Sequence, residues 1–161
     1  MCIKNWFKNL FNPINRLSKD YRIREALKLL DKIVVERLQD KSYDIKWDGS
    51  LPSNVYACRA EDSFGNNFIL INYLWYMAPI EQIACLIAHE SCHIKRVADI
   101  SEEAEATMTE AMTWRTLKVP SKKYTETLLF KRLEKLASMS ASEIVEEISK
   151  SNFYGEVLKV V

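Results

Sequence analysis

Hydrophobic periodicity changes twice along this chain, and the order of those changes constrains the fold more than any other sequence feature. Residues 20–39 carry apolar side chains at steps of three and four, which predicts one amphipathic helix. Residues 42–73 are rich in predicted strands instead, and residues 42–48 alternate polar and apolar side chains as a half-buried strand does. Helical spacing returns at Pro79 and continues through most of the C-terminal half. Strands segregated from helices in this way predict an α+β domain.

This region divides into three predicted strands, at residues 42–48, 54–60 and 68–73. Turn signals separate them, at Asp48 and Gly49 and again at residues 64–67. We therefore expect a small three-stranded antiparallel sheet, packed on the N-terminal helix and on the helix that follows the strands.

Several helices are predicted after the strands. The first begins at Pro79, which suits a first helical turn, and runs to about residue 97. Ser101 is the predicted cap of the second helix and Ser121 that of the third, and residues 142–150 form a short last helix. A length of 161 residues favours a single domain over the whole chain, 1–161, in which residues 119–161 form a helical C-terminal subdomain.

Composition excludes several classes of protein. Apolar residues make up 48% of the chain, which is enough for a core, and 23 basic against 22 acidic residues leave a net charge of +1. That balance is not typical of a nucleic-acid-binding protein. The four cysteines are scattered, no secretory signal is visible, and no apolar run is long enough to cross a bilayer. We therefore expect free thiols and a cytoplasmic location.

The N-terminal segment, residues 1–17, has two interpretations. Lys4 and Lys8 alternate with Trp6, Phe7 and other aromatic or apolar side chains. A short helix that caps the core is the ordinary interpretation, and an amphipathic appendage that contacts a membrane surface is the alternative.

The chain contains 2 histidines, His89 and His93, with Glu90 directly after the first. Residues four apart on a helix leave the same face, so both imidazoles can bind one tetrahedral Zn²⁺. Glu90 projects beside them and can take a proton from a water molecule that zinc has made more acidic. Zinc is therefore the expected cofactor, with His89 and His93 as metal ligands and Glu90 as the catalytic residue.

A hydrolytic zinc site needs a third protein ligand. Glu103 is the predicted one, because residues 98–101 can connect two antiparallel helices and return the next helix alongside His93. Glu110 lies seven residues later on the same face and is the fallback. Glu102 and Asp99 remain as alternatives, although a helix continuing through Asp99 would carry its carboxylate about 9 Å beyond His93.

The His-Glu-x-x-His motif resembles that of the gluzincin zinc peptidases, and in particular the minigluzincins and the ImmA/IrrE-type domains. The likeness extends over about residues 43–114: a strand ending in Ile71 and Asn72, a helix at 79–96, and a segment at 103–107 similar to the Glu-x-Glu/Gln-Ala-Asp/Asn run of those families. It implies a metallopeptidase that cleaves peptide bonds in a peptide or protein substrate. It also implies that residues 68–73 align the substrate by strand pairing.

The chain departs from the family pattern at two positions near the histidines. Thr107 replaces an Asp or Asn that would hydrogen-bond a histidine ligand, and Cys92 replaces a Gly that often precedes the second histidine. An oxyanion stabiliser is also usual, and the candidates are Tyr73, Tyr76 and Tyr124.

The sequence leaves a second function open. A non-catalytic zinc-binding module, acting as a regulatory or scaffold protein of a phage or mobile-element type, would carry the same two histidines. If the chain is a peptidase, the apolar tail at residues 152–161 is a candidate cover for a shallow cleft. The sequence does not indicate the oligomeric state.

Overall fold

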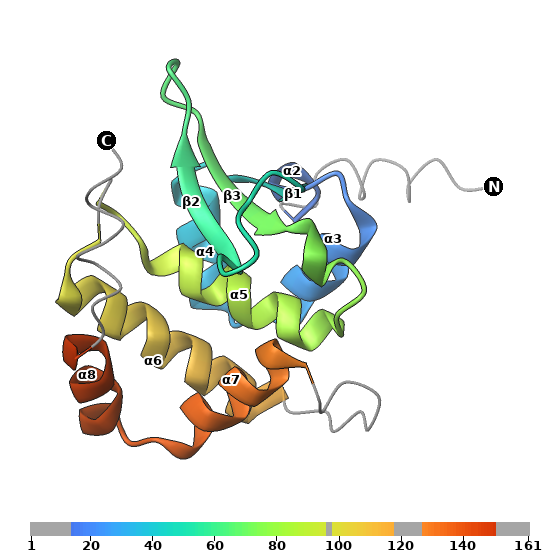
Figure 1. The fold of residues 1–161 in the computed structure, drawn as a ribbon. Coiled ribbons are helices and arrows are strands. Elements are labelled where there is room, and N and C mark those ends of the chain that lie inside the picture. The colour runs from blue at the N-terminus through green and yellow to red at the C-terminus, as the bar shows by residue number, and fades with distance from the viewer. Residues whose placement is uncertain (1–13, 96–97, 118–126, 151–161) are drawn as a thin grey trace.

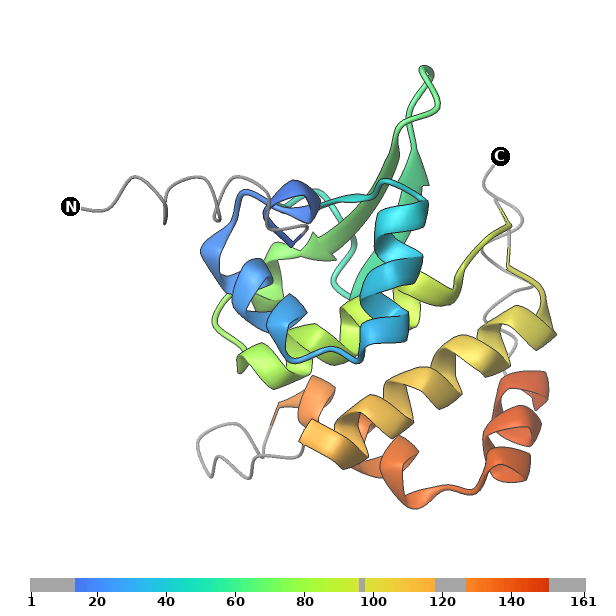
Figure 2. The ribbon, with the colours of Figure 1, turned by 180° about the vertical axis from the view of Figure 1, so that it is seen from behind.

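A computed structural model describes residues 14–95, 98–117 and 127–150, and it has the expected α+β architecture (Figure 1). In chain order the elements are α2 (Ile14–Leu17), α3 (Tyr21–Lys28), α4 (Lys32–Asp40), β1 (Asp44–Asp48), β2 (Ala57–Glu61), β3 (Asn67–Asn72), the 3₁₀ helix η1 (Tyr73–Trp75), α5 (Ile80–Cys92), α6 (Ile100–Leu117), α7 (Leu128–Ser138) and α8 (Ala141–Lys150). The helix α5 lies between the sheet on one side and α6, α7 and α8 on the other (Figures 1 and 2).

The sheet is mixed, so the expectation of an antiparallel sheet is wrong for one of its two pairs. The strand order is β1-β3-β2, with β3 antiparallel to β2 and parallel to β1. A tight turn joins β2 to β3, with Gly65 at a φ of 81°. The central strand has the sequence NFILIN, which is the most continuously apolar of the three. A central position between two strands buries such a sequence best, and this explains why β3 lies between its predecessors.

The predicted helix at residues 20–39 is two helices. Leu29 ends α3, and the side chain of Asp31 then accepts a hydrogen bond from the Ile33 backbone N–H and caps α4. Asp20 caps α3 in the same way. Since Asp is a strong N-cap residue, the signal for a second helix was present at Asp31, and the continuous apolar spacing hid it.

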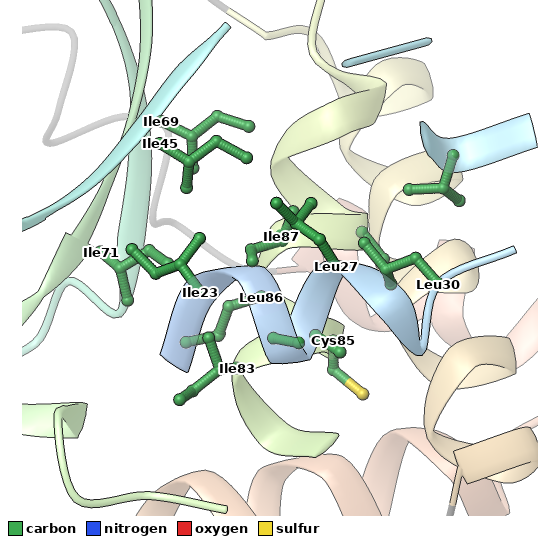
Figure 3. Close-up of a cluster of buried hydrophobic side chains, with 14 of the residues drawn as sticks. Ile23, Leu27, Leu30, Ile45, Ile69, Ile71, Ile83, Cys85, Leu86 and Ile87 are labelled. Atoms are coloured by element: carbon green, nitrogen blue, oxygen red, sulfur yellow. The ribbon is translucent and has the colours of Figure 1, made fainter. Parts of the chain in front are cut away.

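One apolar core joins the sheet to α5 and to the N-terminal helices (Figure 3). Ile23 and Leu27 of α3 meet Ile87 of α5, and Ile69 and Ile71 contribute from the central strand. In α5 every residue from Gln82 to Cys92 is buried. A helix buried on all sides is expected where one element lies between two layers. Any polar side chain on α5 is therefore held in a largely dry environment.

The C-terminal helices cover the other side of α5. Leu129 and Leu133 of α7 are completely buried and belong to the same core, and Ile144 of α8 packs with Ala111 of α6. Thr127 caps α7 by accepting a hydrogen bond from the Phe130 backbone N–H. The helix α7 thus packs against α5, which carries the histidine motif, and α8 packs against α6.

Several expectations fall on residues outside the described ranges: the Ser121 cap, Tyr124, residues 1–13 and the tail at 152–161. Of the N-terminal segment, the structure describes α2, whose Leu17 is buried in the core. Among the described helices, none combines the length and the apolar character needed to cross a bilayer.

Candidate metal centre

The helix that carries the histidine motif ends earlier than the sequence predicted. It stops at Cys92, and His93 is its C-cap residue with an extended backbone (φ −67°, ψ 122°). His89 therefore projects from a helical turn, whereas His93 projects from the first residue after the helix. The expected continuation to about residue 97 is wrong.

Side chains from distant elements hold the end of α5. The ammonium of Lys41 donates to the carbonyl oxygens of Ser91 (3.3 Å) and His93 (3.2 Å), and the hydroxyl of Tyr43 donates to the same His93 oxygen (3.2 Å). The last carbonyls of a helix lack partners within the helix, and a cation there also interacts favourably with the helix dipole. These contacts allow the chain to turn without a glycine.

The chain then returns through a short connection. The carboxylate of Glu102 accepts hydrogen bonds from the backbone N–H groups of Ile94 (2.6 Å) and Lys95 (3.2 Å). Asp99, rather than the predicted Ser101, caps α6, because its side chain accepts from the Glu102 backbone N–H. The first turn of α6 is thereby fixed beside the end of α5.

This arrangement brings Glu103 to both histidines. One carboxylate oxygen lies 3.3 Å from His89 Nε2 and the other 3.5 Å from His93 Nε2. One ligand atom from each of the three residues can be chosen so that all lie within 4.8 Å of one another. Tetrahedral zinc with bonds of about 2.0–2.1 Å places its ligand atoms about 3.3 Å apart. Two imidazole nitrogens and one carboxylate at these separations fit zinc.

Glu90 lies beside this group without belonging to it. Its carboxylate is 3.9 Å from His93 Nε2, and the side chain is almost completely buried. Burial raises the pKa of Glu90 above its ordinary value, against the opposing effect of the two histidines. A carboxylate with a raised pKa next to a metal position is suited to accept and return a proton.

The second ring nitrogen of His89 contacts Glu110, the fallback ligand. His89 Nδ1 lies 3.1 Å from Glu110 Oε2, on the side of the ring opposite Glu103. Arg132 of α7 donates from Nη2 to Glu110 Oε2 (2.6 Å) and from Nε to Glu110 Oε1 (3.2 Å). The structure thus places Glu110 behind the ring rather than at the metal position.

These contacts shift the pKa values of the Glu110 carboxylate and of the His89 ring. Burial by itself would raise the pKa of Glu110, but Arg132 and His89 outweigh burial and lower that pKa to about 2. Burial likewise lowers the pKa of the metal-free His89 ring, and hydrogen bonds with Glu103 and Glu110 overcome it and raise the pKa to about 10. Glu110 is consequently ionised at neutral pH, and a cation at Nε2 would have to replace a tightly held proton.

The second ring nitrogen of His93 has different surroundings. Its Nδ1 is 3.4 Å from Glu102 Oε1, but it is buried and has no hydrogen-bond partner among the described residues. The Glu102 carboxylate instead accepts hydrogen bonds from the backbone N–H groups of Ile94 and Lys95. Asp99 forms an ion pair with Lys95 at the surface. Neither of these two alternative ligands belongs to the group formed by the histidines and Glu103.

Thr107 and Cys92, the two positions that depart from the gluzincin-type pattern, have distinct surroundings in the structure. Thr107 is buried, and its hydroxyl has no hydrogen-bond partner in the described part of the chain. Glu110, one turn further along α6, makes the histidine contact that the resemblance assigns to position 107. Cys92 contacts Arg37 (3.2 Å) and Thr109 (3.4 Å) and does not join the metal-binding group.

A cavity of about 300 Å³ opens beside the histidines. Its lining residues are Asn54, Val55, Tyr56, Ala57, Cys58, Arg59, Leu86, His89, Glu90, His93, Lys95, Ala98, Glu103 and Arg132. Burial raises the pKa of the Cys58 thiol to about 11, so this thiol stays protonated at neutral pH and is a poor metal ligand.

Of the three suggested tyrosines, Tyr73 and Tyr76 do not line this cavity, and Tyr124 lies outside the described residues. Tyr73 and Tyr76 stack on each other with ring centroids 5.0 Å apart, and both contact Trp47. Sequence reasoning missed Tyr56 and Arg132, which do line it. No motif marks either residue, and the sequence indicated only that Tyr56 belongs to a strand-like segment at residues 54–60.

Comparisons of the chain with protein-family models, with curated proteins and with solved structures found no match.

Proposed function

We propose that this protein is a zinc-dependent metallopeptidase, in which His89, His93 and Glu103 hold the metal and Glu90 is the general base. The convergence of these three ligand side chains from two elements, beside an open cavity, is the observation that carries the proposal. The resemblance of residues 89–93 to the gluzincin motif supports the same assignment.

When bound, zinc would supply Lewis-acid chemistry, which makes water easier to deprotonate and polarises a carbonyl group. The protein contributes the remaining functions. Glu90 lies within reach of that position but outside the ligand group, so it can remove a proton from water and deliver it to the leaving amine. The dry surroundings of α5 strengthen every charge interaction at this site.

The edge strand β2 is the proposed substrate-aligning element. The expectation that residues 68–73 pair with the substrate is wrong, because β3 already pairs with β1 on one side and β2 on the other. Strand β2 pairs with β3 alone among the described strands, and residues from Tyr56 to Arg59 line the cavity. An extended peptide can therefore add to the outer edge of β2 and reach Glu90.

A cytoplasmic location is part of the proposal. Its support is that the described cysteines, Cys58, Cys85 and Cys92, are all free thiols, as is usual in a reducing compartment.

The variant Glu90→Gln tests the proposed function. Purified wild-type protein should bind one zinc ion and cleave members of a mixed peptide library, identified by mass spectrometry. Glu90→Gln should bind zinc equally and lose activity by at least about 100-fold, since a general base contributes about 10²–10⁴-fold. The matched control is Glu105→Gln, because Glu105 lies on the surface of the same region and contacts Arg37.

Two results would contradict the peptidase. One is equal cleavage by Glu90→Gln and the wild type. The other is a zinc-loaded wild type that cleaves none of the library, which would favour the non-catalytic zinc module instead.

A further inference from the structure

Arg132 connects the C-terminal helices to the candidate metal centre. It comes from α7, and its guanidinium makes two hydrogen bonds to Glu110 of α6, at 2.6 and 3.2 Å. The same guanidinium lies over the ring of Tyr56, 5.2 Å from the ring centroid. Arg132 therefore forms part of the cavity wall and contacts residues from two other segments.

Glu110 depends on this arginine. Its side chain is completely buried, and a buried carboxylate is costly unless a cation and hydrogen bonds compensate for it. Among the described residues, Arg132 is the only Lys or Arg within ion-pair distance of Glu110. The paired N–H groups of a guanidinium also fix the orientation of a carboxylate, which a point charge does not.

The orientation of Glu110 in turn determines how the His89 ring faces. Glu110 Oε2, which accepts from Arg132, is also the oxygen 3.1 Å from His89 Nδ1. With Nδ1 held there, Nε2 is directed at Glu103, 3.3 Å away. Groups that hold the outer nitrogen of a histidine ligand set its tautomer and orientation.

We propose that Arg132 is a positioning residue of the metal site, which holds the His89 ring ready for zinc through Glu110. The C-terminal helical part is then a component of the site and not an appendage to it. The proposal rests on the metal-binding half of the proposed function and does not require peptidase activity.

A purely structural role for Arg132 makes different predictions. In that case Arg132 would only attach α7 to the rest of the protein. Loss of any other side chain that attaches α7 should then affect the zinc site to a similar extent. Arg115 provides the comparison: it extends from α6 to the carbonyl oxygens of Ala137 (2.8 Å) and Met139, near the end of α7, and does not line the cavity.

The test uses the full-length protein and two measurements on each variant. The first is the ring ¹⁵N spectrum of the metal-free protein, which is simple because the chain has 2 histidines. The second is zinc affinity, from competition with a chromophoric chelator. The variants are Arg132→Gln, Arg132→Lys, the control Arg115→Gln, and the double change Glu110→Gln with Arg132→Met, which leaves no unpaired buried charge if Arg132→Gln does not fold.

Arg132→Gln and the double variant should change the His89 ring signals and weaken zinc binding by about 10–100-fold. Arg132→Lys should lie between these variants and the wild type, because it keeps the charge and loses the paired geometry. Arg115→Gln should match the wild type within about twofold.

The proposal is overturned if the double variant or Arg132→Lys has the wild-type ring signals and zinc affinity, or if Arg115→Gln weakens zinc binding as much as the Arg132 variants. A wild type that binds zinc without cleaving peptides defeats the proposed function alone. A wild type that binds no zinc defeats both the proposed function and the assignment of Arg132 to a metal site.

Discussion

His89 and His93 belong to one short motif and are buried to nearly the same extent, yet the protein holds them in different ways. His89 lies within α5, and a chain of side chains, Glu110 and then Arg132, fixes its outer nitrogen. His93 lies just beyond the helix, and its outer nitrogen lies 3.4 Å from Glu102 but has no hydrogen-bond partner among the described residues. Lys41 and Tyr43 hold its backbone carbonyl. One ring is therefore positioned by side chains behind it, and the other by the path of the main chain.

Glu110→Ala should destabilise the metal-free protein far more than Glu102→Ala, although each carboxylate lies beside one histidine. Loss of Glu110 leaves Arg132 without its partner, which should lower the free energy of unfolding by about 3–4 kcal/mol. Glu102 accepts from exposed backbone N–H groups that water can satisfy, so its loss should cost about 1 kcal/mol. Urea denaturation at neutral pH measures both values. Equal losses would remove the proposed difference between the two sides of the site.

Lowering the pH should also remove the stability that the ionised Glu110 carboxylate contributes, because protonation neutralises its charge. The folded-state pKa of Glu110 is about 2, against an ordinary value of 4.5. A lowered folded-state pKa contributes stability that is present above pH 4.5 and is lost as the pH falls toward 2. The loss for wild-type protein over that interval should exceed the loss for Glu110→Gln by roughly 3 kcal/mol.

The measurement is denaturant unfolding of metal-free protein at a series of pH values. Parallel stability curves for the two proteins would show that the Glu110 carboxylate is not held in its ionised form by folding.

Lys41→Met should affect the His93 side alone. The change removes the cation that caps α5 and should lower the free energy of unfolding by about 1 kcal/mol. Zinc affinity should fall by less than about tenfold, because the backbone at His93 loosens while its ring is retained. The ring ¹⁵N signals of His89 should not change. Lys32→Met is the control, since Lys32 lies at the surface and pairs with Glu36. A change at His89 as large as that at His93 would show that the two rings are not held independently.

The smallest effect is expected at Thr107. Its hydroxyl is buried without a described partner, so Thr107→Val removes an unsatisfied polar group and keeps the shape of the side chain. The free energy of unfolding should stay within about 0.5 kcal/mol or rise by up to about 1 kcal/mol. A thermal melt checks this result. A clear loss of stability would indicate that the Thr107 hydroxyl has a role that its contacts do not explain.

Local patterns in the sequence were sufficient for the parts of the fold that depend on neighbouring residues. The alternation of residues 42–48 and the turn signals that follow it located three strands, and Pro79 marked the start of the motif helix. The strand order was not predictable in this way, because β3, the last of the three strands in the chain, lies between β1 and β2. The direction of a pair depends on long-range packing, which short turn signals do not encode.

In the candidate site, too, the features that depend on nearby residues were predictable and those that depend on distant residues were not. The spacing of His89 and His93 predicted a common face, and the short connection predicted that Glu103 would return to them. The end of α5 at Cys92 depends on Lys41 and Tyr43, which lie about fifty positions earlier in the chain. Such contacts have no signature in a single sequence.

The complete burial of the Glu110 carboxylate affects the order of folding and metal binding at the proposed site. Small zinc domains such as classical zinc fingers stay unfolded until they bind metal, so their folding depends on the metal supply. Here an arginine and a core of leucines and isoleucines already hold the surroundings of one imidazole in place. For the proposed zinc site, this means that folding would not require metal, so folding and metal loading would be separate events. The folded protein would then be present before the proposed zinc ion binds, and its proposed activity would follow the supply of zinc.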